Sequence, residues 1–183
     1  MLTAHAAGRL RVEWSLPGEP RVYSEASADL IGGRIANLTA ASSGTEWLGE
    51  PLGVHSAATL VVAAGTAEHL SRWSRAAEAG LAALTRVVPH DRKWAEPVVV
   101  LVPNGLTDFA AYAGNGADRV GAVTVVPGLP SSEGVRVVVN PTITQKSTDD
   151  RVLIAHESVH AWMRSPRLTG TPGWMIEGIA EAF

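Results

Sequence analysis

Residues 151–183, "RVLIAHESVHAWMRSPRLTGTPGWMIEGIAEAF", contain two histidines four positions apart, with a glutamate directly after the first. On a helix, residues four apart project from one face with Cβ atoms about 6 Å apart. His156 and His160 can therefore each place a ring nitrogen about 2.0–2.1 Å from one zinc ion. Glu157 would flank this pair and reach a metal-bound water rather than the metal, which is the place of a general base.

A catalytic zinc site needs a third protein ligand and one open position. The chain contains no cysteine, and Glu177 and Glu181 are the only carboxylates after Glu157. Because they are also four apart, they share a helix face, which suggests one ligand and one group that accepts a hydrogen bond from a ligand histidine. Glu177, nearer the start of its helix, is the predicted ligand, and Glu181 is the predicted hydrogen-bonding partner.

Two predicted helices carry these side chains. "STDDRVLIAHESVHAWM" opens with a variant of the capping box, in which Ser147 precedes Asp150 by three residues, and predicts a helix over 148–164. After it, Thr171 as the cap and Pro172 at the first helical position predict a second helix through "PGWMIEGIAEAF".

The sequence before these helices predicts a sheet covered by a long helix. From Thr66 to Val88, apolar residues recur every three or four positions, which is typical of an amphipathic helix. Four β-branched runs predict strands, and the last two are expected to form a hairpin. These runs are 59–65, 96–105, 121–128 and 134–141, and a short helix capped by Thr107 is expected after the second.

The N-terminal part is predicted to be an appended element. Residues 10–24 indicate two short extended pieces around a Pro-Gly turn. Apolar residues in "SADLIGGRIANLTA", 27–40, favour a helix, and a glycine- and serine-containing loop over 41–57 would separate it from the rest.

Composition excludes several classes of protein. A length of 183 residues with 46% hydrophobic content fits one globular domain. The net charge of −3, without a run of Lys or Arg, argues against nucleic acid as a partner. The longest apolar runs are far shorter than the roughly 20 residues of a membrane span. The helical pattern is still running at Phe183, which favours a chain truncated at its C-terminus.

Other candidate binding residues are better explained by packing. Trp162 and Trp174 have helix-face spacing and are expected to pack the two C-terminal helices together. The strand that ends at Asn140 offers a backbone that an extended substrate could pair with, but β-branched runs are more typical of sheet core.

The C-terminal motifs resemble those of a known family. His156-Glu157-Ser158-Val159-His160 and the later "WMIEGIA", in which sixteen residues separate Glu177 from His160, look like the gluzincin zinc metallopeptidases, the superfamily of thermolysin and aminopeptidase N. The resemblance implies that His156, His160 and Glu177 bind zinc, that Glu157 is the base and that Glu181 orients a histidine. It covers 151–183 closely and the preceding strands loosely. Larger members carry a Tyr or His after the third ligand, which this chain lacks within its last six residues.

The expected architecture is therefore an α+β, zincin-like fold. It would consist of a small mixed sheet, a long helix over one face and two metal-binding helices that close a cleft. Residues 1–57 would form the appended segment, and 58–183 the catalytic domain. Relatives of this kind often work outside the cytoplasm, so the resemblance favours an extracytoplasmic location.

The expected function is hydrolysis of peptide bonds in a peptide or protein substrate, by water that zinc activates and Glu157 deprotonates. One alternative is a non-catalytic or degenerate module that binds metal and recognises extended polypeptide without cutting it. Another is a hydrolase of non-peptide amides or esters, because the same chemistry attacks any activated carbonyl. The sequence does not indicate cleavage specificity or oligomeric state.

Overall fold

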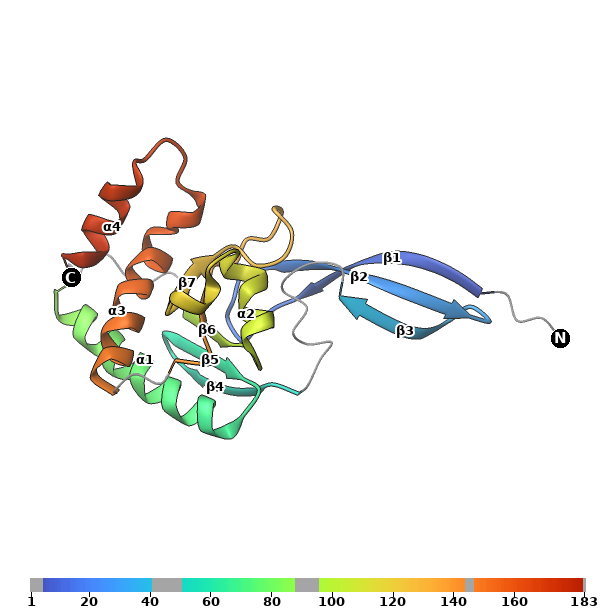
Figure 1. Cartoon of the computed structure of the whole chain (residues 1–183), viewed down its shortest axis with the longest axis horizontal. Coiled ribbons are helices and arrows are strands. Elements are labelled where there is room, and N and C mark those ends of the chain that lie inside the picture. The colour runs from blue at the N-terminus through green and yellow to red at the C-terminus, as the bar shows by residue number, and fades with distance from the viewer. Residues whose placement is uncertain (1–4, 41–50, 88–95, 144–146, 183) are drawn as a thin grey trace.

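The computed structural model describes residues 5–40, 51–87, 96–143 and 147–182, which adopt an α+β fold with two separate sheets (Figure 1). The strands are β1 (His5–Trp14), β2 (Val22–Ile31), β3 (Arg34–Ala40), β4 (Gly53–Ala57), β5 (Leu60–Ala64), β6 (Val98–Val102), β7 (Ala122–Val125) and β8 (Arg136–Val139). The helices are α1 (Ala67–Val87), α2 (Leu106–Ala113), α3 (Ser147–Met163) and α4 (Gly173–Glu181), with 3-10 turns η2 (Ala117–Arg119) and η3 (Ser165–Arg167).

The larger sheet has five strands in the order β4-β5-β6-β8-β7. The neighbours β5, β6 and β8 are parallel, whereas β4 and β7 lie antiparallel at the two edges. Because the parallel strands are buried on both faces, they are apolar almost throughout. The mixed sheet and the β7–β8 hairpin confirm the prediction, but β4 lies in a region predicted to be a loop.

Alternate residues of the central strands point into two separate cores, one on each face of the sheet. Val62, Val100 and Val137 belong to the core beneath α1, α3 and α4. Val61 and Val99 belong to the opposite core, beneath α2. The long helix that was expected over one face is α1, and α3 and α4, which carry the predicted ligands, pack on the same side of the sheet.

Helix α1 packs against α3 through a close backbone contact at a glycine and through an ion pair. A Cβ atom at Gly80 would lie 2.9 Å from the carbonyl oxygen of Arg151 and 3.2 Å from the amide nitrogen of Ala155, so only glycine fits there. Arg72 donates two hydrogen bonds, of 2.7 and 2.8 Å, to the buried carboxylate of Asp150. The hydrogen bond to Asp150 is the main cause that raises the pKa of Arg72 above its ordinary value.

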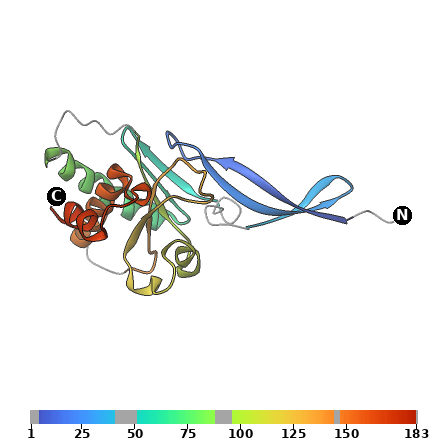
Figure 2. The ribbon, with the colours of Figure 1, turned by 90° about the horizontal axis from the view of Figure 1, so that it is seen from above.

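Strands β1, β2 and β3 form an antiparallel sheet that extends away from the rest of the molecule (Figures 1 and 2), which we call the N-terminal arm. The helix predicted over 27–40 is therefore wrong. Ile31 pairs with Arg34, so Gly32 and Gly33 form a two-residue hairpin loop with φ angles of +59° and +78°. Positive φ at both positions suits the type I′ turn that joins tightly paired strands.

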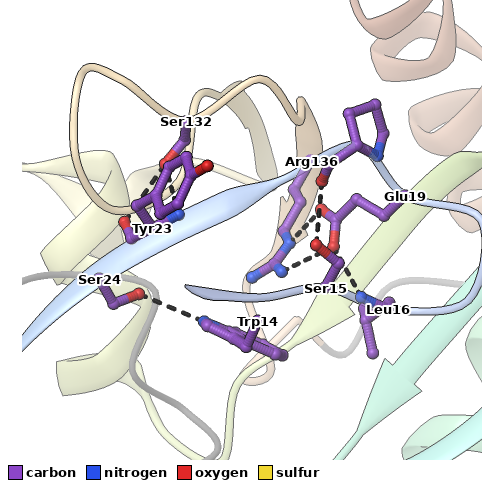
Figure 3. Close-up of polar contacts among 9 residues, drawn as sticks. Trp14, Ser15, Leu16, Glu19, Tyr23, Ser24, Ser132 and Arg136 are labelled. Carbon is purple, nitrogen blue, oxygen red and sulfur yellow. Dashed lines mark hydrogen bonds and ion pairs between the residues drawn. The ribbon is translucent and has the colours of Figure 1, made fainter. Parts of the chain in front are cut away.

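A buried ion pair joins the base of the arm to the larger sheet (Figure 3). Arg136, on β8, donates hydrogen bonds of 2.6 and 2.8 Å to the carboxylate of Glu19, in the β1–β2 connection, and both side chains are completely buried. The Arg136 guanidinium also lies 4.2 Å from the centre of the Trp14 ring. Leu16, next to this pair, belongs to the core beneath α2. The arm thus contributes side chains to the interior of the main fold.

Two predicted helix caps differ from the structure. The residue before α2 is Gly105, so Thr107 lies inside the first turn rather than at the cap. The residue before α4 is Pro172, so Thr171 lies outside the helix. The side chain of Ser147 falls outside the described residues. Within the described ranges, no helix has both the length and the apolar character needed to cross a membrane.

Candidate metal centre

The two histidines of α3 face each other. The nitrogens Nε2 of His156 and His160 are 3.1 Å apart, and the ring planes meet at 73° with centroids 4.8 Å apart. His160 lies deeper in the fold, with 7% of its side chain exposed compared with 25% for His156. The helix predicted over 148–164 is thus confirmed, and it places both rings on one face.

The connection between α3 and α4 turns the chain back toward these rings. Arg164 ends α3 in the left-handed conformation, with φ +53°, which costs a non-glycine residue about 1 kcal/mol. Its guanidinium donates a 2.8 Å hydrogen bond to Glu96 and another to the carbonyl oxygen of Glu133. Arg167 donates to the carbonyl oxygen of Ser132. These contacts tie the connection to the loop between β7 and β8.

The same loop is held on its other side by the arm. The Ser132 hydroxyl accepts a 2.9 Å hydrogen bond from the Tyr23 amide and lies 3.2 Å from the Tyr23 carbonyl oxygen (Figure 3). The amide of Glu133 donates to the carbonyl oxygen of Arg21 over 2.7 Å. The β7–β8 loop is therefore packed between the arm and the segment that leads into α4.

Helix α4 brings Glu177 to the histidines. Its Oε2 lies 3.4 Å from Nε2 of His156 and 3.4 Å from Nε2 of His160. In the described part of the chain, these three residues form the group of side chains that could hold a metal ion. The side chain of Glu177 is 62% exposed, so the group is open to solvent on the α4 side.

The spacing of these donor atoms fits zinc. Two ligands with bonds of about 2.0–2.1 Å in a tetrahedral site have donor atoms about 3.3 Å apart. The observed separations are 3.1, 3.4 and 3.4 Å, and two imidazole nitrogens with one carboxylate oxygen are donors that zinc accepts. Three ligands leave one tetrahedral position for water or substrate.

Glu157 lies outside this group and contacts the sheet instead. It is mostly buried, and its Oε2 accepts a 2.6 Å hydrogen bond from the hydroxyl of Thr124 on the edge strand β7. The same hydroxyl oxygen lies 3.1 Å from the main-chain carbonyl oxygen of Glu157. The predicted base is therefore held beside the predicted ligands without being one of them.

A pocket of about 300 Å³ opens at this position. Its walls combine the site's polar groups with apolar side chains from β7, the α3–α4 connection and α4. They comprise Ala122, Val123, Thr124, Glu157, His160, Ser165, Pro166, Ile176 and Glu177. The predicted base and two of the predicted ligands thus face a space that a small group can enter.

The structure does not bring every predicted residue to the site. Glu181 lies one turn beyond Glu177 with an exposed side chain, and it is not part of the His-His-Glu group. The buried Nδ1 of His160 has no hydrogen-bond partner among the described residues. Trp162 packs against the core beneath α1, α3 and α4, which agrees with a packing role, although not with a contact between the two C-terminal helices. Trp174 is 73% exposed, so its predicted packing role is wrong. Asn140 follows an internal strand, β8, which confirms its assignment to the sheet core.

Sequence reasoning missed Thr124. In the run "GAVTVVPG", this residue is the polar member of a strand that is otherwise apolar between its glycines and proline. A hydroxyl on the helix-facing side of a β-strand usually has a hydrogen-bond partner, which is the signal that could have drawn attention to it. Its partner is 33 residues away and could not be identified from local sequence.

No family model matches this chain, and neither the curated proteins nor the solved structures contain a protein that matches it. The proposed function therefore rests on the residues of the site and their geometry.

Proposed function

We propose that this protein is a zinc-dependent hydrolase of peptide bonds. The observation that carries the proposal is that three donor atoms from two helices, in His156, His160 and Glu177, lie 3.1 to 3.4 Å apart. A buried carboxylate, Glu157, lies beside them at a solvent-accessible pocket. A purely structural zinc site has four protein ligands and no open position, so this arrangement favours catalysis.

In this proposal, three residues bind the metal and a fourth transfers protons. His156, His160 and Glu177 would hold the ion, which when bound supplies Lewis-acid polarisation of water and of a substrate carbonyl group. Glu157 removes a proton from the attacking water and passes it to the departing amine. Its contact with Thr124 keeps the carboxylate at the wall of the pocket during both transfers.

The edge strand beside the pocket supports a polypeptide substrate. Strand β7 is the last strand on its side of the sheet, so its outer backbone edge has no partner strand among the described residues. Extended peptides bind such edges by adding a strand to the sheet. Ala122, Val123 and Thr124 belong both to this strand and to the pocket wall, so a paired peptide would pass directly over Glu157.

Turnover by the zinc-loaded chain of 183 residues tests this proposal. Quenched fluorescent peptides of mixed sequence should be cleaved, a chelator should abolish cleavage, and added zinc should restore it. Glu157→Gln should abolish turnover while one zinc per chain stays bound, and the exposed Glu68→Gln on α1 serves as the matched control.

Each alternative function predicts a different result. A non-catalytic module would bind zinc and extended peptides without cleaving any of them. A hydrolase of small amides or esters would turn over such substrates and leave peptides intact. Loss of zinc from the Glu157→Gln variant would show that Glu157 is a ligand, which contradicts the role proposed here.

A further inference from the structure

The side chain of Thr124 occupies an unusual position in the sheet. Ala122, two residues earlier on β7, points into the core beneath α1 and α3, whereas Val123 and Val125 pack against the opposite core. Because side chains alternate along a strand, Thr124 must lie on the α3 face, like Ala122. A hydroxyl on that face requires a partner, and the partner is the carboxylate of Glu157.

The hydrogen-bond distances show which oxygen receives the hydroxyl proton. Oγ1 of Thr124 lies 2.6 Å from Oε2 of Glu157 and 3.1 Å from the carbonyl oxygen of the same residue. A threonine hydroxyl has a single proton to donate. A separation of about 2.5–2.7 Å is typical of an O–H donor bound to an ionised carboxylate. The short contact is therefore the hydrogen bond that matters, and the carbonyl contact is secondary.

We infer that Thr124 is a positioning residue that fixes the orientation of the Glu157 carboxylate. The hydroxyl holds one carboxylate oxygen, Oε2, against β7 and leaves the other, Oε1, to take the proton of the attacking water. Without this contact, the carboxylate would rotate about its terminal torsion, which is soft in glutamate. The inference rests on the proposed function, because it assigns a role within that reaction, but it also predicts a binding effect that does not require turnover.

A merely structural role for Thr124 makes a different prediction. If the residue only joined β7 to α3, its loss would weaken the fold and the metal site together. If it acts through Glu157, its loss should leave zinc affinity unchanged, and should have no further effect once Glu157 has been replaced. A double-mutant cycle separates these two roles.

The variants for this test are Thr124→Val, which removes the hydroxyl at nearly constant volume, and Thr124→Ser, which keeps it. Both would be made in the full chain, and Thr124→Val would also be combined with Glu157→Gln. Thr85→Val is the matched control, because it makes the same change on an exposed face of α1. Each variant would be loaded with zinc and its zinc affinity measured.

In Thr124→Val, kcat for peptide cleavage should fall roughly 10- to 100-fold, because a hydrogen bond to a charged group is lost. KM and zinc affinity should stay unchanged, Thr124→Ser should keep most of the activity, and Thr85→Val all of it. The affinity of the zinc-loaded chain for acetohydroxamate, whose hydroxyl proton needs an acceptor beside the metal, should fall in Thr124→Val and in Glu157→Gln, and no further in the double variant.

Either readout can overturn the inference. The inference is wrong if Thr124→Val keeps the kcat and hydroxamate affinity of the wild type, or if this variant weakens zinc binding. It is also wrong if Thr124→Val lowers hydroxamate affinity equally in the wild type and in the Glu157→Gln background. A wild-type chain that binds zinc but cleaves no peptide would refute the proposed function instead. In that case the hydroxamate affinities alone decide whether Thr124 positions Glu157.

Discussion

Nε2 of His156 lies 3.1 Å from Nε2 of His160 on one side of α3, and each of these nitrogens can donate or accept one hydrogen bond. Two lone pairs or two N–H groups that point at each other repel, whereas one proton or one cation between the two nitrogens makes the contact attractive. The Glu177 carboxylate oxygen, 3.4 Å from both nitrogens, adds negative charge at the same point. Under the proposed function, that charge stabilises the divalent cation that the two nitrogens would hold.

Removal of the Glu177 charge should therefore weaken zinc binding. Loss of a group that only hydrogen-bonds to a zinc ligand lowers zinc affinity by about 10- to 100-fold. Glu177 is itself a proposed ligand, so Glu177→Gln should weaken zinc binding by more than about 100-fold. His160→Ala should have at least as large an effect. Competition with a chromophoric chelator measures both, with Glu68→Gln as the control. Wild-type affinity in Glu177→Gln would mean that α4 provides no ligand.

Glu181 provides a test that separates the resemblance from the geometry. The resemblance to gluzincins predicts that Glu181 orients a ligand histidine, and its loss would then weaken zinc binding by about 10- to 100-fold. In the structure its side chain is exposed and lies outside the His-His-Glu group. We therefore expect Glu181→Gln to bind zinc with wild-type affinity in the same competition assay. A tenfold loss would show that Glu181 does reach a histidine when the metal is bound.

The site was predictable to the extent that it depends on local spacing. His156 and His160 share a face because any helix places residues four apart on one side. The same rule put Glu177 and Glu181 on one face, but it could not show which turn of α4 meets α3. That choice depends on the connection at Arg164, whose left-handed conformation is held by contacts with Glu96 and the β7–β8 loop.

The fold was likewise predictable where it depends on local sequence, and not where it depends on contacts between distant segments. Strands β5, β6 and β8 were predictable, because a strand buried on both faces is apolar throughout. The N-terminal arm was not, because the apolar residues around Gly32 and Gly33 fit either a helix or a hairpin. The hairpin forms because β2 pairs with strands on both sides of it, and pairing between strands is not visible in a short window of sequence.

Gly80 should be essential for the packing of α3 against α1. An added methyl group would meet the Arg151 carbonyl oxygen at 2.9 Å, and overpacking of this kind costs about 1–3 kcal/mol of stability. Gly80→Ala should therefore lower the free energy of unfolding in urea, although alanine is the better helix former. Gly178→Ala in α4 is the matched control, because a Cβ atom there meets no described residue within 4 Å. This replacement should raise helix stability by up to about 1 kcal/mol. Equal stability of the two variants would refute the close approach.

The ion pair between Glu19 and Arg136 joins the base of the N-terminal arm to the main sheet. Both side chains are completely buried, so removal of one partner leaves an uncompensated charge in the interior. Glu19→Ala should therefore cost about 3–5 kcal/mol in the free energy of unfolding. The double replacement Glu19→Leu with Arg136→Met should cost less than the single one, because it removes both charges together. Urea denaturation followed by circular dichroism measures these differences. A single variant within about 1 kcal/mol of the wild type would mean that the pair contributes no more to stability than an ion pair exposed to water.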